Sequence, residues 1–138
     1  MAGSQGRRGR ITRSADFDRV YRSGRSHANR LLVVHTFPRG DDEPSRLGLS
    51  VSRKVGGAVE RNRVKRLIRE AFVDRGEALS SGQDIVVVAR AGISEFVDRE
   101  GLEGVTGVLD ELLAEAGVIV AGESESSSGA GDSREVDE

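Results

Sequence analysis

The sequence predicts one α+β domain in which helices pack against a single sheet. Three observations favour this fold class: two strand-like runs at residues 31–37 and 47–51, an amphipathic helical pattern at 59–75, and a short β-branched run at 85–89. The strand, helix, strand order of the last three segments implies a crossover between strands of one sheet. At 138 residues the chain has room for one such domain and its tails.

The N-terminal part is expected to form a basic arm followed by a short helix. Residues 1–13 are rich in Gly, Ser and Arg and contain little to bury, so we expect them to be disordered. A helix is expected from Ser14, a good N-cap, to Gly24, with Phe17 and Tyr21 on one face. The folded domain is therefore predicted to begin at residue 14.

The two strand-like runs that follow are separated by a turn-rich segment. Residues 31–37 are mostly β-branched and apolar, and residues 47–51 alternate apolar with small side chains. Pro38, Gly40 and Pro44 interrupt the pattern between them. We therefore predict a hairpin with a longer loop.

A helix is predicted over residues 59–75, with Gly76 as its C-cap, and its two faces differ in character. At about 100° per residue, one arc is apolar: Val64, Leu67, Ile68, Ala71 and Phe72. The opposite arc is polar and basic, with Arg63 on its edge: Arg61, Asn62, Lys65, Arg66 and Arg69. One side is suited to packing and the other to binding.

The last helix is expected to begin at the Ser94 N-cap and to end at Gly117. Apolar residues recur at helical spacing in its second half: Leu102, Val105, Val108, Leu109, Leu112 and Leu113. Glycines at 101, 104 and 107 each cost about 1 kcal/mol relative to Ala, so we expect a kink, fraying or a late start. Residues 118–138 are expected to form a disordered acidic tail.

Charge is segregated along the chain, although the formal net charge is only -2. Residues 1–75 carry 18 Lys and Arg against 8 Asp and Glu, whereas residues 76–138 carry 3 against 15. This distribution indicates a basic surface for a polyanion and a separate acidic segment.

The composition argues against several classes of protein. Because the chain has no cysteine, it has no disulfide framework, thiolate metal site or cysteine nucleophile. Two histidines are too few for most zinc sites. No apolar run approaches the roughly 20 residues of a membrane span, and the N-terminus lacks the apolar core of a signal peptide. We expect a cytoplasmic protein that does not bind membranes.

The basic arc of the helix at 59–75 is the strongest local signal of function. A rigid helix that holds cations at fixed spacing can contact successive phosphates of RNA, and Arg53 and Lys54 in the preceding loop would extend this surface. The alternative is an ordinary solvated helix face. Few acidic residues compensate the charge, since only Glu60 and Glu70 flank the arc.

These residues also carry a family resemblance. The stretch Gly-Leu-Ser-Val-Ser-Arg-Lys-Val-Gly at 48–56, followed by Val59 and Arg-Asn-Arg-Val-Lys-Arg-Leu-Ile-Arg at 61–69, resembles the bacterial ribonuclease P protein. Flanking segments match the same family in the same order: Asp16-Phe17, Val20-Tyr21, Ala28-Asn29-Arg30 and residues 84–90. The resemblance covers about residues 14–113, a single domain between the two tails that we extend to residue 117.

The resemblance implies a two-layer sandwich of four strands and three helices. It also implies a left-handed βαβ crossover carrying the basic helix, where the general rule predicts a right-handed one. The additional short strand is implied near residues 25–29.

The resemblance further implies a subunit of an RNA enzyme, with no catalytic residue or metal site in the protein. The catalytic RNA would hydrolyse precursor tRNA to remove its 5′ leader, with magnesium bound mainly by RNA, one protein per RNA, and a magnesium requirement lowered by the protein. Residues implied to bind the catalytic RNA are Arg53, Lys54, Arg61, Asn62, Arg63, Lys65, Arg66 and Arg69. Residues implied to bind the leader, in a cleft between the first helix and the sheet, are Phe17, Tyr21, His35, Lys54, Ala89 and Arg90.

Other interpretations stay open from the sequence. Phe17 and Tyr21 at helical spacing are often core residues, and His35, where the family commonly has tyrosine, is compatible with a structural role. Ala91 and Gly92 replace a Lys-Pro pair that often follows the residue matching Arg90. A metal-dependent nuclease would need clustered carboxylates and histidines, which do not stand out. A general RNA- or DNA-binding module, such as a ribosomal protein or a helix-turn-helix reader, is the third class.

Overall fold

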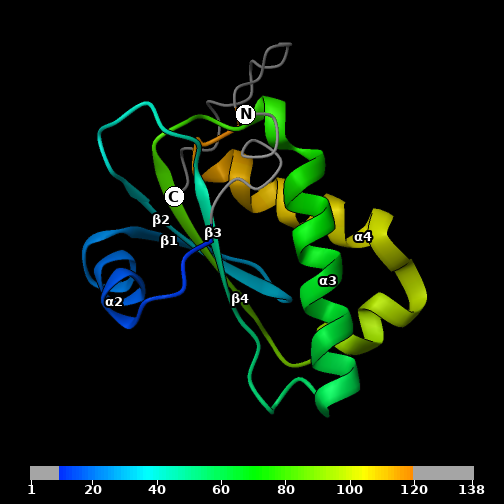
Figure 1. Cartoon of the computed structure of the whole chain (residues 1–138). Helices are drawn as coiled ribbons and strands as arrows, with labels where there is room; N and C mark the ends of the chain where they lie inside the picture. The colour runs from blue at the N-terminus through cyan, green and yellow to red at the C-terminus, as the bar shows by residue number, and fades with distance from the viewer. Residues whose placement is uncertain (1–9, 120–138) are drawn as a thin grey trace.

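The computed structural model describes residues 10–119, which fold into a sheet with helices packed against it (Figure 1). In chain order the elements are α2 (Ser14–Ser23), β1 (Arg25–Ala28), β2 (Leu32–Pro38), β3 (Arg46–Ser50), α3 (Ala58–Asp74), the 3₁₀ turn η1 (Gly76–Ala78), β4 (Gln83–Ala89) and α4 (Ile93–Glu115). The α+β class is confirmed. The short strand that the resemblance implied near residues 25–29 is β1.

The four strands form one sheet in the order β1-β2-β4-β3. β4 pairs antiparallel with β2 and parallel with β3, so the predicted hairpin between β2 and β3 is wrong. β4 lies between them because Asp84, Ile85, Val86 and Val87 are all buried, and only a central strand is covered on both faces. The loop at residues 39–45 therefore passes across β4.

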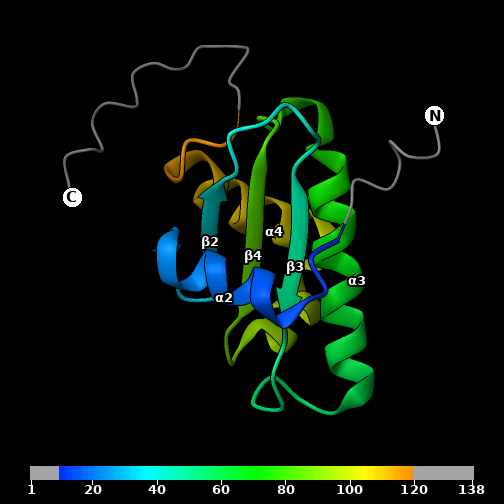
Figure 2. The ribbon, with the colours of Figure 1, turned by 60° about the vertical axis from the view of Figure 1, so that its left-hand side comes forward.

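The connection from β3 to β4 is a left-handed crossover. Figure 2 views the sheet with α2 in front: β3 and β4 run downward, β4 lies to the left of β3, and α3 lies behind the sheet. The chain thus turns in the sense opposite to the general rule for parallel strands. The handedness that the resemblance implied is the one observed.

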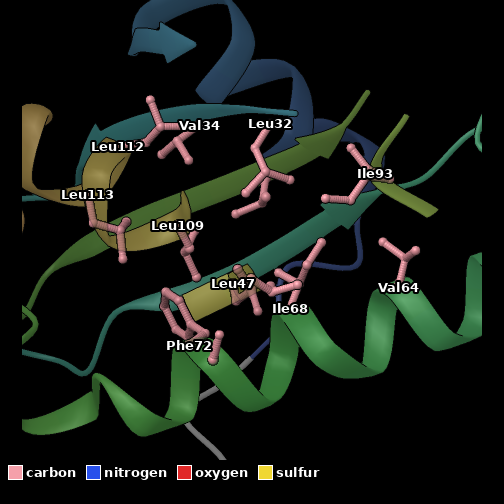
Figure 3. Packing of buried hydrophobic residues seen from close by; sticks show 14 of the residues in the cluster. Leu32, Val34, Leu47, Val64, Ile68, Phe72, Ile93, Leu109, Leu112 and Leu113 are labelled. Atoms are coloured by element: carbon pink, nitrogen blue, oxygen red, sulfur yellow. The ribbon is translucent and has the colours of Figure 1, made fainter. Parts of the chain in front are cut away.

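Helices lie against both faces of the sheet. α3 and α4 cover one face, and the main core forms between them and the strands (Figure 3). Fully buried members of this core include Leu32, Val34, Ile68, Phe72 and Leu109. α2 covers part of the other face over a smaller cluster of Ile11, Val20 and Val86. The expected two-layer sandwich therefore gains a short third layer.

The kink expected in the last helix occurs at Gly101. Its backbone angles, φ 64° and ψ -158°, are not helical, and they divide α4 into two segments. A positive φ of this size strains any residue with a Cβ, so glycine is required there. Gly104, in the second segment, approaches the Phe96 ring, and a Cβ at this position would lie 3.1 Å from it.

The starts of two helices differ from the prediction. The N-cap of α2 is Arg13 and not Ser14, and the N-cap of α4 is Gly92 and not Ser94. Neither N-cap residue makes a side-chain capping hydrogen bond. Serine is common both at N-caps and in first turns, so its presence alone could not distinguish the two positions. Gly92 decides the start of α4 because its φ of 100° favours glycine.

The end of α3 also differs from the prediction. Its C-cap is Arg75, whose backbone N–H donates to the carbonyls of Ala71 and Phe72 at 3.2 and 3.1 Å. Gly76 instead begins η1, and it is not among the glycines with positive φ in the described chain. It therefore lacks the left-handed conformation of a C-cap glycine.

The fold extends slightly beyond residues 14–117. Ile11 is only 4% exposed, and its N–H donates to the Leu47 carbonyl at 3.0 Å. Val118 is 3% exposed, and its carbonyl accepts a hydrogen bond from the Ser80 N–H at 2.8 Å. Residues 10–13 and 118–119 thus belong to the folded domain. The rest of the two predicted tails, residues 1–9 and 120–138, lies outside the described residues.

Ion pairs close one end of the sheet face that α2 covers. The buried carboxylate of Asp84 accepts hydrogen bonds from Arg46 at 2.8 and 2.7 Å and from Arg39 at 2.6 Å. Arg46 also lies 3.6 Å from Asp16 of α2. Burial opposes ionisation of Asp84, but the hydrogen bonds from the two arginines outweigh it and hold the pKa of Asp84 below its usual value. This network fixes the β2–β3 loop to the start of β4.

Candidate nucleic-acid interface

The basic face of α3 follows from the way the helix packs. Its buried stripe, Val64, Ile68, Ala71 and Phe72, turns toward the sheet and α4. The remaining surface carries Asn62 and four cations: Arg61, Lys65, Arg66 and Arg69. None of these four cations forms an ion pair with another residue of the described chain. The helix therefore offers positive charge at fixed spacing that no carboxylate among residues 10–119 neutralises.

Arg63 is in a different position from the other arginines of α3. Its guanidinium bonds the Asp98 carboxylate of α4 at 2.5 Å. The outer surface of α4 beside it is acidic, with exposed Glu95, Glu100 and Glu103. Arg63 thus lies at the border between the basic face of α3 and the acidic face of α4, and its positive charge is already paired with the carboxylate of Asp98.

Arg53 and Lys54 are held on a turn between β3 and α3. The turn is closed by hydrogen bonds from the Val55 N–H to the Ser52 carbonyl at 3.0 Å and from the Gly56 N–H to the Arg53 carbonyl at 3.2 Å. Val55 anchors the turn because its side chain is only 7% exposed. Both cations are exposed, so they extend the basic surface beyond the N-terminal end of α3.

On the other face of the sheet, three rings from α2 and β2 lie in a row. The ring centroids of Phe17 and Tyr21 are 6.2 Å apart, and those of Tyr21 and His35 are 4.9 Å apart in an edge-to-face arrangement. The structure therefore brings together three of the residues that the resemblance implied for leader binding. Such a row can accept unpaired bases of any sequence.

The structure distinguishes Phe17 from Tyr21, for which the sequence left open both a core position and a place in a binding surface. The Phe17 ring lies over Gly48, where a Cβ would come within 2.9 Å of it, and the ring packs against the small cluster under α2. Phe17 is therefore largely a packing residue. Tyr21 is 42% exposed, which leaves much of its ring available to a ligand.

His35 is half-buried between Tyr21 and the neighbouring strands. Burial lowers the pKa of His35 from its usual value. Its imidazole is therefore neutral at pH 7, and it can stack on a base or exchange hydrogen bonds but supplies no positive charge.

Ala89 does not belong with these rings. It is 6% exposed and packs in the core on the α3 and α4 side of the sheet. Its partner across the strands is Leu32, which lies in the same core. The resemblance therefore transferred a position whose side chain points to the opposite face.

The residues that do border the rings were not found from the sequence. The strand register places four side chains in one row across the α2 face of the sheet, next to the position of His35: Ala28, Val33, Val88 and Ser50. All four are at least partly exposed, and we call them the open row. Alternation along β4 could have indicated Val88, since it lies two residues beyond buried Val86. The other members required the strand pairing.

Arg90 and Lys54 lie just beyond the strands that carry the open row. The backbone N–H of Arg90 donates to the Leu31 carbonyl at 2.9 Å, and its guanidinium donates to the Asn29 carbonyl at 3.0 Å. The Asn29 side chain fixes this turn by accepting hydrogen bonds from the Leu31 and Leu32 N–H groups at 3.0 and 2.9 Å. The Arg90 cation is therefore positioned at the end of β4, beside the β1–β2 turn.

Between residues 10 and 119, no helix is long and apolar enough to cross a membrane. Within the same residues, no three His, Asp or Glu side chains gather as a group that could hold a metal ion.

An α+β domain with unpaired cations on a rigid helix of its described part, and an aromatic row with an exposed Tyr21 on the other face, belongs to the class of RNA-binding domains. Comparison with known proteins gives the family. A family model described as Ribonuclease P matches residues 6–113. The chain belongs to this ribonuclease P protein family.

Individual relatives agree with this assignment. The ribonuclease P protein component of Halalkalibacterium halodurans is 42% identical over 110 residues, which are 80% of this chain and 89% of that protein. The Staphylococcus aureus RNase P protein structure has a TM-score of 0.71 at 38% identity, covering 80% of this chain and 96% of that one. A mutant of that protein with defective mRNA degradation activity has a TM-score of 0.75 at 36% identity, covering 86% and 96%.

Proposed function

We propose that this chain is the protein component of ribonuclease P and works with a catalytic RNA to remove the 5′ leader from precursor tRNA. The observation that carries the proposal is the separation of two surfaces suited to RNA. Cations of α3 lie at least partly exposed on one side of the molecule, and the row of Phe17, Tyr21 and His35 lies on the other face of the sheet. One protein can then bind the catalytic RNA and an unpaired strand at the same time.

The basic face of α3 is the surface that we assign to the catalytic RNA. Arg61, Lys65, Arg66 and Arg69 contact phosphates, Asn62 can both donate and accept hydrogen bonds, and Arg53 and Lys54 extend the contact. Arg63 keeps its bond with Asp98 and positions the two helices. This assignment narrows the set implied by the resemblance by one residue.

The aromatic row and the open row are the surfaces that we assign to the leader. Exposed Tyr21 stacks on a base, and the aliphatic side chains of Val33 and Val88 lie beneath the single-stranded RNA. Arg90 and Lys54 contact the phosphates of the leader. We leave Ala89 out of this set because its side chain lies in the opposite core.

We assign the hydrolysis itself to the RNA. The carboxylates nearest the two surfaces, Asp16, Asp84 and Asp98, are held by arginines in ion pairs. Such pairs hold the side chains in place, and the two arginines lower the pKa of Asp84, which makes it a weaker general base. We further propose one protein per RNA and a location in the cytoplasm.

Magnesium is assigned mainly to the phosphates of the RNA and its substrate. Cations on α3 that neutralise phosphates replace part of the counterion atmosphere that the folded RNA otherwise needs. The protein should therefore lower the magnesium concentration at which the RNA cleaves.

The test is cleavage of a precursor tRNA at low magnesium by three preparations: this protein, a bacterial ribonuclease P RNA, and both together. The proposal expects the mature 5′ end only from the mixture. Cleavage by the protein alone would show that the protein, and not the RNA, catalyses the hydrolysis. A mixture no more active than the RNA would mean that the basic face serves another nucleic acid.

A second candidate activity is degradation of mRNA. The name of the Staphylococcus aureus mutant ascribes mRNA degradation activity to its parent protein, whose structure this chain resembles over most of its length. An mRNA included in the same experiment tests it. Loss of full-length mRNA with protein alone, in the presence of magnesium and absent in a buffer control, would support this activity.

A further inference from the structure

The free edge of β3 carries a short segment of chain that the proposed RNA surfaces do not use. β3 is the last strand of the sheet, and Arg10 forms a parallel bridge with Leu47 on its outer side. Ile11 then places its side chain in the small cluster under α2, and the chain continues through Arg13, the N-cap of α2. Arg10 and Arg13 are both exposed.

We propose that Arg10 and Arg13 bind the phosphate backbone of RNA and join the basic face of α3 to the leader side of the molecule. The proposal rests on the proposed function, since it adds a contact to the same assembly. Neither arginine forms an ion pair within residues 10–119, whereas the neighbouring Arg46 is occupied by Asp84 and Asp16.

The position of the segment supports a continuous surface. At about 100° per residue, three cations share one flank of α3: Arg61, Lys65 and Arg69. The middle of this flank lies about 160° around the helix axis from Arg63, which contacts Asp98 of α4. That flank therefore faces away from α4. α3 packs beside β3, and Figure 3 shows Leu47 of β3 next to Ile68 and Phe72 of α3.

Arg10 is thus attached at the level of Leu47, on the strand that α3 covers. Arg13 follows three residues later, where the chain crosses to the α2 face of the sheet (Figure 2). The two cations span the edge between the two surfaces that we assign to RNA.

The anchoring of this segment distinguishes it from an ordinary charged tail. The backbone hydrogen bond between Ile11 and Leu47 and the burial of the Ile11 side chain hold the backbone of residues 10–13 in place. Cations on a fixed backbone lose less conformational entropy when they bind than cations on a free tail. Arg10 and Arg13 should therefore add measurably to RNA affinity.

The experiment compares two double variants of the full chain. Arg10→Gln/Arg13→Gln removes the proposed contacts, and Arg22→Gln/Arg25→Gln removes two exposed arginines at the other end of α2 as a control with equal charge. Binding is measured against salt concentration in two arms. One uses the catalytic RNA alone, and the other uses the assembled complex with precursor tRNA or leaderless tRNA.

Two lost phosphate contacts should make the slope of log affinity against log salt shallower by about 1.4, which is about 25-fold in affinity at 0.1 M salt. A loss in the first arm identifies the catalytic RNA as the partner, and a loss confined to leader-bearing substrate identifies the leader. Arg10→Lys/Arg13→Lys should recover most of the slope because it keeps the charge.

Equal effects of the two Gln variants in both arms would overturn the inference. Failure of the wild-type protein to bind or activate the catalytic RNA would instead remove the proposed function, so the two failures can be told apart. Thermal unfolding of both Gln variants should match the wild type, because all four side chains are exposed.

Discussion

Replacement of Arg66 and of Arg63 by Gln should have very different effects on binding to the catalytic RNA, although each change removes one positive charge from α3. Arg66 is exposed and has no ion pair in the described chain, whereas Arg63 bonds Asp98 at 2.5 Å. One lost phosphate contact makes the salt slope shallower by about 0.7 to 0.9, or about fivefold to eightfold in affinity at 0.1 M salt. We expect this loss for Arg66→Gln and about twofold or less for Arg63→Gln.

The assay is titration of labelled catalytic RNA with each variant at four potassium chloride concentrations and constant magnesium. Thermal unfolding provides the control, because Arg63→Gln also removes a contact between α3 and α4, worth about 0.2 to 1 kcal/mol at this exposure. Equal slopes for the two variants, each shallower than the wild type, would refute the reasoning. Arg63 would then have to leave Asp98 and contact RNA in the complex.

Three other predictions concern the α2 face and the ion pairs beside it. Tyr21→Ala should weaken binding of leader-bearing precursor by about 1 to 3 kcal/mol and leave leaderless tRNA unaffected, because one stacking ring is lost; equal losses in both titrations would exclude a leader contact. Gly48→Ala should lower the free energy of unfolding by about 1 to 3 kcal/mol in urea titrations, since its Cβ would lie 2.9 Å from the Phe17 ring; unchanged stability would mean that α2 shifts freely. Asp84→Asn should lower the free energy of unfolding by about 3 kcal/mol at pH 7, because two arginines lose their buried partner. The pKa of Asp84 is lowered in the folded state, so its contribution is present above about pH 3.9 and is lost as pH falls further. The gap between wild type and Asp84→Asn should therefore close in strong acid, and a constant gap would point to another cause.

The elements that could be predicted are those whose signal lies within one segment. The apolar stripe of α3 at Val64, Ile68 and Phe72 is readable from helical spacing, and the burial of β4 is readable from its run of β-branched residues. A weak first half of the last helix follows from the conformational cost of its three glycines, but the position of the kink at Gly101 does not. The basic face of α3 is the remainder of the same helical pattern.

Features that depend on distant partners could not be predicted in this way. Chain order favoured a β2–β3 hairpin, but β4 pairs with both strands because it is the most buried one. The face to which Ala89 points required the register against β2. The pairing of Arg63 with Asp98 joins residues 35 positions apart, and nothing in either segment indicates it.

The ends of the fold depended on single side chains. Ile11 and Val118 each lie at the border of a polar segment, and composition assigned both to the tails. Ile11 is buried in the small cluster under α2, and Val118 is buried at the margin of the main core. An average over a segment does not detect a single anchoring residue.

The open row has a consequence for the range of substrates. Three of its four side chains, Ala28, Val33 and Val88, present only methyl groups, which neither donate nor accept hydrogen bonds. Ser50 adds the one hydroxyl group of the row, so the row offers few groups that could distinguish one base from another. Under the proposed function, such a surface would accept the 5′ leaders of precursor tRNAs that differ in sequence.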